Sequence, residues 1–168
     1  MDFDPCLIRS VTAEGVARIK IGHPLLDAFL DLVASRSRWN TVLASAFDLK
    51  VFFTVVAKDP VEVDTNDVLA FIAPQRQPRR GAMVIRIEDG ERGLASRTIK
   101  RRLATIANLY EYLLVRGDTS VTRNPVPRGL ALRRPGGRTV VRGVPLIRAP
   151  RTLPRVIDPP EANAFVGA

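Results

Sequence analysis

The strongest periodicity in the chain lies between residues 94 and 114. Placed at 100° per residue, the large apolar side chains of this segment fall within one narrow arc. A helix with a single apolar stripe has to bury it against other elements, so the pattern predicts one helix of a multi-helix domain. Ser96 is a suitable N-cap for this helix. The stripe consists of Ile99, Leu103, Ile106, Tyr110 and Leu113.

Three further helices are predicted upstream. Pro24 opens a broad apolar face over residues 24–36. A second stripe of about five turns follows, made of Trp39, Val42, Ala46, Leu49, Phe53 and Val56. The third helix begins near Asp64 or Thr65, either of which can cap it, and Pro74 is expected to close it. The piece "GVARIKIG" is either a strand or an ordered arm.

The expected fold class is therefore all-α, a compact bundle of four or five helices with an extended C-terminal linker. We expect an N-terminal arm at 1–22, a domain at 23–118 with a basic insert at 75–93 that contains a short hairpin, and a linker at 119–155. The linker has no acidic residue and is interrupted by prolines, so it is expected to stay extended. Residues 156–168 read as the start of a further helix.

Charge is distributed very unevenly along the chain. Residues 1–74 hold 7 Lys and Arg against 10 Asp and Glu, whereas residues 75–155 hold 19 against 5. A basic excess confined to one half indicates a polyanionic partner, most commonly nucleic acid. With no signal peptide and no uninterrupted apolar run of about 18 residues, we expect a cytoplasmic protein without a membrane partner.

The sequence offers little for metal or cofactor chemistry. Cys6 is the only cysteine and His23 the only histidine. An internal disulfide and a zinc site built from cysteines are excluded, and a Ser-His-Asp arrangement has almost nothing to use. We therefore predict no metal, no cofactor and no small-molecule substrate.

Cations crowd the first two turns of the predicted 94–114 helix, where the positive end of the helix dipole disfavours them. They are Arg97, Lys100, Arg101 and Arg102, and no carboxylate follows until Glu111. At 100° per residue Arg97 and Arg101 lie on the side away from the apolar stripe, together with Thr105 and Asn108, and Lys100 lies nearer its flank. A solvated charged face is the simpler explanation, but the basic linker that follows favours nucleic acid.

A helix fits the major groove of DNA, where Arg and Asn read base edges and Lys, Arg, Ser and Thr hold phosphates. At the start of the second helix, Asn40 has an alternative role as a helix cap. The residues expected to contact DNA are Arg38, Asn40, Thr41, Arg97, Thr98, Lys100, Arg101, Thr105 and Asn108 in the domain, with Arg133 and Arg134 in the linker.

The order of these segments resembles the N-terminal core-binding (SAM-like) domain of tyrosine recombinases, the phage-integrase family. The resemblance rests on "NTVLASAFDLKVFF", "TNDVLAFI", "SRTIKRRLATIANLYEYLLVRG" and "TRNPV" in that order. Ser45 stands where the family commonly has an aromatic residue. "PRTLPRVIDPPEANAFVGA" is similar to the opening of the family's catalytic domain. The positions in the family's register are Thr41, Leu49, Phe52, Thr98, Ile99, Arg101, Leu103, Leu109, Tyr110 and Leu113.

The resemblance implies binding to double-stranded DNA during site-specific recombination and integration, with other recombinase protomers as partners. It also implies that the tyrosine nucleophile and the Arg, Lys and His groups of the reaction belong to a catalytic domain missing here. We thus expect a truncated product that is not an enzyme. Two alternatives remain open: a stand-alone DNA-binding regulator, and a basic module that binds RNA or an acidic protein. Sequence does not separate a working truncation from a decayed gene.

Overall fold

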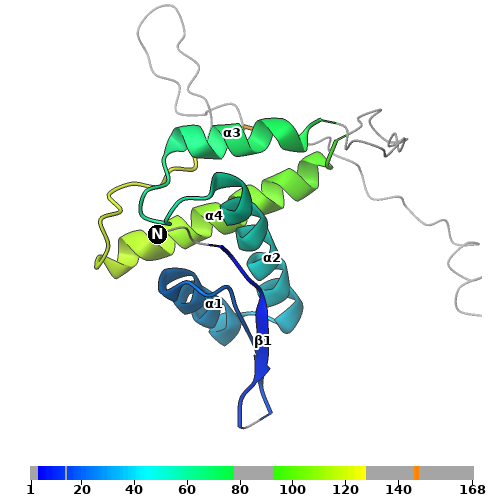
Figure 1. Cartoon of the computed structure of the whole chain (residues 1–168), viewed down its shortest axis with the longest axis vertical. Helices are drawn as coiled ribbons and strands as arrows, with labels where there is room; N and C mark the ends of the chain where they lie inside the picture. Colours follow the sequence, from blue (N-terminus) through cyan, green and yellow to red (C-terminus); the bar gives the residue numbers. More distant parts are fainter. Residues whose placement is uncertain (1–3, 14, 78–92, 128–145, 148–168) are drawn as a thin grey trace, which may run out of the picture.

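The computed structural model describes residues 4–13, 15–77, 93–127 and 146–147. These residues form a mostly helical domain with one small sheet, and α2 lies at its centre in contact with α1, α3, α4 and β2 (Figure 1). In chain order the elements are β1 (Ile8–Val11), β2 (Ala17–Lys20), α1 (Pro24–Arg36), α2 (Trp39–Val56), α3 (Thr65–Gln75) and α4 (Ser96–Arg116).

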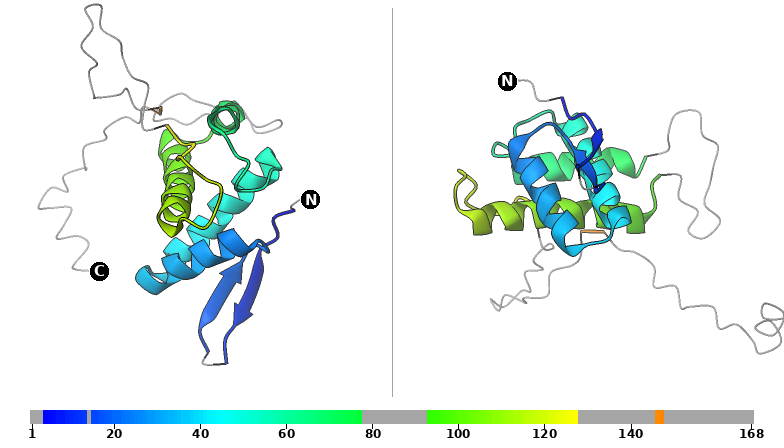
Figure 2. Two further views of the ribbon diagram at one scale, coloured as in Figure 1. Left: turned by 90° about the vertical axis from the view of Figure 1, so that its left-hand side faces the viewer. Right: turned by 90° about the horizontal axis from the view of Figure 1, so that it is seen from below.

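The β1–β2 hairpin shows that the all-α expectation is wrong. The strands are antiparallel, with Arg9 opposite Ile19, and they project from the helices (Figures 1 and 2). Ile19 is the one buried residue of the two strands. The piece containing residues 17–20, left open as strand or arm, is a strand. β1 was not predicted, because it forms by pairing with β2 and its own sequence shows no alternation of apolar and polar residues.

Helices α1 and α2 confirm the periodicity that predicted them. In α1, Pro24 occupies the first turn and His23 caps it, with Nδ1 accepting a hydrogen bond from the Leu25 N–H at 3.3 Å. In α2 the predicted stripe is buried from Val42 to Phe53, but Trp39 at the first position is exposed. α2 ends at Ala57, whose φ of 50° is left-handed and stops the helix.

α3 begins with a capping box, and its N-cap is Asp64, one of the two residues predicted to cap it. The Asp64 carboxylate accepts hydrogen bonds from the N–H groups of Asn66 and Asp67, and the Asp67 carboxylate accepts one from the Asp64 N–H. The prediction that Pro74 closes α3 is wrong by one residue, because Pro74 lies inside the helix and Gln75 is its last residue. The Leu94 N–H donates to the Gln75 carbonyl at 2.8 Å, which joins the two ends of the insert. The predicted hairpin of the insert falls mostly on 78–92, outside the described residues.

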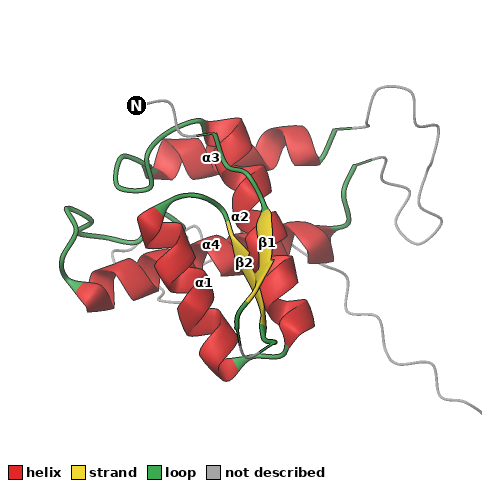
Figure 3. Cartoon of the chain, turned by 60° about the horizontal axis from the view of Figure 1, so that its bottom comes forward, coloured by secondary structure: helices red, strands yellow, loops and turns green. Residues whose placement is uncertain are grey.

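α4 lies across α2 and buries the predicted stripe, so that Ile99, Leu103, Ile106, Tyr110 and Leu113 all belong to the core (Figure 3). The Tyr110 hydroxyl donates a hydrogen bond to the Pro60 carbonyl at 2.8 Å. Burial raises the pKa of this phenol far above its ordinary value. The N-cap of α4 is Ala95 and Ser96 is the first helical residue, which corrects the expected cap by one position.

Residues 119–127 stay against the domain, which corrects the expected extended linker for this part of it. Asn124 donates from Nδ2 to the Ala107 carbonyl and to the Glu111 carboxylate, both at 3.0 Å, and Val126 packs against the core. Two apolar residues further along, Leu146 and Ile147, also pack on the core. The Asn124–Pro125 turn and the apolar Val126 are enough to hold residues 124–127 against α4.

Among the described helices, α2 alone has the length and mean hydropathy (1.2) of a membrane-spanning helix. Core helices of other proteins meet the same criterion, so one such helix is weak evidence of a membrane span. Asp48 and Lys50 interrupt the apolar run. The inner face of α2 is buried by the helices around it.

Candidate nucleic-acid interface

The outer face of α4 carries a continuous exposed stripe that we call the α4 basic stripe. Its members are spaced by three or four residues, so they lie one above another along the first half of the helix. All five are exposed, three are cations, and none is acidic. The α4 basic stripe consists of Arg97, Lys100, Arg101, Ala104 and Asn108.

The first turn of α4 lacks the groups that usually stabilise a helix N-terminus. Ala95 provides no side-chain cap, and the first turn contains no acidic residue. The first N–H groups of a helix have no partner within the helix, and the dipole makes this end attractive to anions. Arg97 and Lys100 add formal positive charge at the same end, so the start of α4 is suited to a negatively charged partner.

A buried carboxylate on α2 orders the inner edge of the stripe. Asp48 is 2% exposed, and its Oδ2 lies 2.9 Å from Arg101 Nη1. The same oxygen accepts a hydrogen bond from the Thr105 hydroxyl at 3.1 Å. Thr105 is itself buried, so its predicted place on the exposed face is wrong: it joins α4 to α2 instead of facing a ligand.

Burial and the neighbouring polar groups have opposite effects on the ionisation of Asp48. Burial raises the pKa of the Asp48 carboxyl above its ordinary value, and the charge of Arg101, the Thr105 hydroxyl and the charge of Arg102 offset part of that rise. Arg102 is mostly buried and donates from Nη1 to Gln75 Oε1 at 2.7 Å, which ties α3 to α4. Among the predicted cations, Arg101 is thus held by an internal partner, whereas Arg97 and Lys100 are exposed and form no ion pair with another residue that the structure describes.

The start of α2 presents the other predicted contacts. Arg38, Asn40 and Thr41 are all exposed. The N-cap is Arg38 and it makes no side-chain capping bond, so the alternative role of Asn40 as the cap is ruled out. Thr98 on α4 is half-buried, and Arg133 and Arg134 lie outside the described residues.

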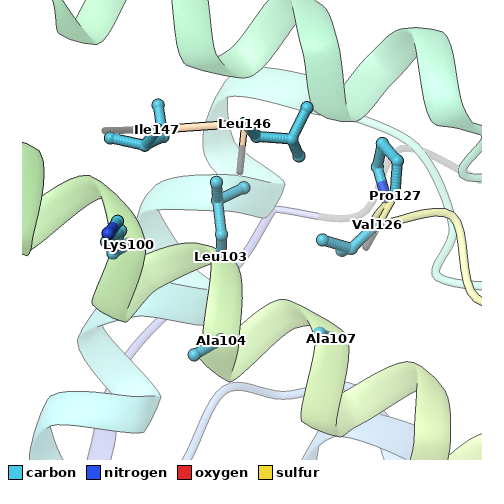
Figure 4. Close-up of a pocket in the computed structure, with 8 residues that line it drawn as sticks. All are labelled: Lys100, Leu103, Ala104, Ala107, Val126, Pro127, Leu146 and Ile147. Atoms are coloured by element: carbon cyan, nitrogen blue, oxygen red, sulfur yellow. The ribbon is translucent and has the colours of Figure 1, made fainter. Parts of the chain in front are cut away.

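Beside the α4 basic stripe runs an open groove of about 200 Å³, which sequence reasoning missed. Its floor is α4, with Leu103 pointing up from the helix, and Leu146 and Ile147 lie across from it (Figure 4). Val126 and Pro127 close one side. Lys100 belongs both to this groove and to the stripe. The sequence feature that could have indicated the groove is the apolar "PLI" within a basic segment.

Nucleophilic and metal-binding groups are scarce in the described part of the chain. Tyr110 is buried, and the half-buried Tyr112 packs its ring against Phe29 with centroids 5.8 Å apart. His23 Nε2 lies 3.3 Å from Asp59 Oδ2, at the start of α1. The described residues contain no group of three or more His, Cys, Asp or Glu suited to a metal ion.

No family model matches the chain, and neither does any curated protein or solved structure. The likeness to the core-binding domain of tyrosine recombinases therefore rests on the segments quoted above.

Proposed function

We propose that this domain binds double-stranded DNA through the α4 basic stripe. The observation that carries the proposal is the exposure of Arg97, Lys100 and Arg101 in the first two turns of α4, whose start has no side-chain cap and no acidic residue. Arg97 lies in the first turn of α4, where a cation destabilises the free protein by about 0.3–1 kcal/mol, and the effect of the dipole on Lys100 in the second turn is smaller. A polyanion removes that penalty.

Duplex DNA suits the shape and chemistry of this face. A helix enters the major groove, where Lys and Arg contact phosphates and Asn108 reads a base edge. The small Ala104 at the centre of the stripe allows close approach of the duplex. Arg38, Asn40 and Thr41 at the exposed start of α2 are proposed as additional contacts.

Within DNA-binding proteins, we place the domain as the core-binding, SAM-like part of a site-specific tyrosine recombinase acting in DNA integration. The order of sequence segments and the register of α4 support this placement. The domain would hold DNA without cutting it. Tyr110 is unsuited to attack a phosphate, because its hydroxyl is buried and donates to the Pro60 carbonyl.

The decisive test measures binding of a fluorescent duplex by anisotropy over a range of salt concentrations. The variant Arg97→Ala with Lys100→Ala removes two charges from the stripe and leaves the Asp48–Arg101 pair intact. We expect it to weaken binding and to lower the slope of log affinity against log salt by about two. The matched control is Arg116→Ala with Arg123→Ala, two exposed charges beyond the stripe. Equal affinity and slope in both variants would exclude the stripe as the contact surface.

Two comparisons separate the alternatives. Equal or tighter binding to structured RNA, or to an acidic protein, at the same salt would favour a general basic module. A footprint restricted to attachment-type recombination sites would favour the recombinase assignment, whereas occupancy of promoters would favour a stand-alone regulator.

A further inference from the structure

The β1–β2 hairpin carries cations on two strands that contribute little to the core. Seven of the eight strand residues are exposed, and Ile19 is the buried one. Neither strand contains an acidic residue, and Glu14, the one acidic residue between them in sequence, lies outside the described residues. The strands therefore form an exposed basic ribbon, whose cations are Arg9, Arg18 and Lys20.

The root of the hairpin is fixed to α1. Ile21, the residue after β2, is fully buried. Asp27 on α1 accepts hydrogen bonds with Oδ1 from the N–H groups of Ile21 at 2.7 Å and Gly22 at 3.3 Å. The Cys6 N–H donates to the Ile21 carbonyl at 3.1 Å, so the chain entering β1 is held at the same point. From this root the strands project away from the helices (Figures 1 and 2).

The strand register places two of the cations on the outer face of the ribbon. Residues directly opposite each other share a face, and successive residues alternate between faces. Ile19 is buried, so its face is the one toward the helices. Arg18 and Lys20 lie on the other face, opposite Ser10 and Ile8. Two residues apart on a strand correspond to about 6.6 Å, so the two cations can hold phosphates along one DNA strand.

The hairpin lies beside α2, the helix whose start is already proposed to contact DNA. β2 contacts both α1 and α2. Figures 1 and 3 show the ribbon next to α2, and in Figure 1 its tip and the loop between α1 and α2 both lie at the lower end of the molecule. Arg36 and Arg38, which flank that loop, are exposed. The cations of the ribbon therefore extend the basic surface at the start of α2.

A solvated hairpin is the simpler explanation of the charges, since cations on edge strands discourage pairing with other chains. It does not explain the large apolar side chains exposed beside them, because exposed apolar edge strands promote aggregation. Duplex DNA suits both kinds of residue. A two-stranded ribbon fits the major groove, where cations contact phosphates and apolar side chains contact thymine methyl groups. The large apolar residues exposed on the hairpin are Ile8, Val11 and Val16.

We propose that the β1–β2 hairpin is a second DNA-contacting element, in which Arg18 and Lys20 hold phosphates of the duplex bound by the α4 basic stripe. This inference rests on the proposed function of the stripe. β2 and α4 each pack on α1 and α2, so one pair of helices carries both contacts. The duplex would therefore be held at two places on a single scaffold.

The first test repeats the anisotropy measurement over a range of salt concentrations with two matched variants. Arg18→Gln with Lys20→Gln removes both charges from exposed positions, and Arg18→Lys with Lys20→Arg keeps them. We expect the neutral variant to lose roughly tenfold in duplex affinity at physiological salt and to lower the salt slope by about two. The charge-keeping control should bind like the wild type. Circular dichroism checks that both retain the helical fold.

The second test uses Cys6, the only cysteine of the chain, which is exposed at the root of the hairpin. A photoactivatable crosslinker attached to its thiol should join the protein to a bound duplex. The control carries the same reagent on Ala70→Cys in a Cys6→Ser background, which places it on the exposed side of α3. This control should give no crosslink.

Failure of the wild type to bind a duplex overturns the proposed function and this inference together. A different result overturns the hairpin contact alone: the wild type binds, Arg97→Ala with Lys100→Ala lowers the salt slope, and Arg18→Gln with Lys20→Gln keeps wild-type affinity and slope. Absence of a crosslink from Cys6 in a saturated complex also overturns the hairpin contact alone.

Discussion

Replacing Asp48 by asparagine tests the physical origin of the cluster between α2 and α4. The carboxyl is buried, and burial raises its pKa despite the neighbouring Arg101, Thr105 and Arg102. The raised pKa means that the charged form is less favourable in the folded protein than in water. Asparagine has nearly the same shape, carries no charge, and keeps an oxygen for the Thr105 hydroxyl. Asp48→Asn is therefore expected to leave the fold as stable as the wild type, or slightly more stable.

The structure sets the magnitude. Arg101 is 48% exposed, so the released guanidinium regains water, and the lost pair is worth about 1 kcal/mol or less. Removal of the desolvation penalty offsets this loss, since each pKa unit corresponds to about 1.4 kcal/mol. The free energy of unfolding should thus change by no more than about 1 kcal/mol, equivalent to about 4–8 °C in melting temperature. Asp48→Ala should be less stable than Asp48→Asn by about 1 kcal/mol, because the Thr105 hydroxyl loses one of its two acceptors and keeps only the Arg101 carbonyl at 3.2 Å.

Urea unfolding at pH 7 and near pH 4 provides the assay. A carboxyl with a raised folded-state pKa contributes stability that is present below its unfolded pKa and lost as pH rises through the folded pKa. The wild type should therefore gain stability relative to Asp48→Asn as the pH falls. Destabilisation of Asp48→Asn by about 3 kcal/mol or more at pH 7 would refute this reasoning, since the charged pair would then be strongly stabilising. The reasoning would also be refuted if the wild type lost stability relative to Asp48→Asn as the pH falls.

Two further substitutions probe neighbouring parts of the fold. Tyr110→Phe leaves the Pro60 carbonyl without its donor and should lower the free energy of unfolding by about 1–2 kcal/mol in urea titrations, with DNA affinity unchanged; loss of DNA binding in a folded variant would contradict a purely structural role. The N–H groups of Asp67 and Asn66 lower the pKa of Asp64, so its contribution is present above the unfolded pKa and lost as pH falls. The stability gap between wild type and Asp64→Ala should accordingly shrink near pH 3, opposite in sign to the Asp48 series, and a gap that is constant with pH would count against the capping role.

Most of the helical core could be predicted from the sequence because it is a local property. Apolar residues three and four apart on α4 identify the buried face whatever they pack against. The five residues of the predicted stripe, from Ile99 at its start to Leu113 at its end, are all in the core. Capping chemistry is equally local, which is why Asp64 and Pro24 marked true helix starts. The exposed cations Arg97 and Lys100 followed from the same helical angles.

What could not be predicted depends on partners distant in the chain. Thr105 lies at a polar position on the helical wheel, yet it is buried because Asp48, 57 residues earlier, accepts its hydrogen bond. β1 has no signal of its own and exists through pairing with β2. Composition suggested that residues 119–155 stay extended, but in the described part Asn124 bonds to α4 and Ile147 is buried against the core.

The β1–β2 hairpin is expected to open locally, separately from the unfolding of the helical core. Seven of its eight strand residues are not buried, and Ile19 is the strand residue that belongs to the core. An isolated two-stranded hairpin is at best marginally stable in water. The hairpin is therefore expected to open while α2 and α4 stay packed, so that its backbone amides exchange with solvent faster than those of the helical core. The helical core exchanges only when the domain itself unfolds.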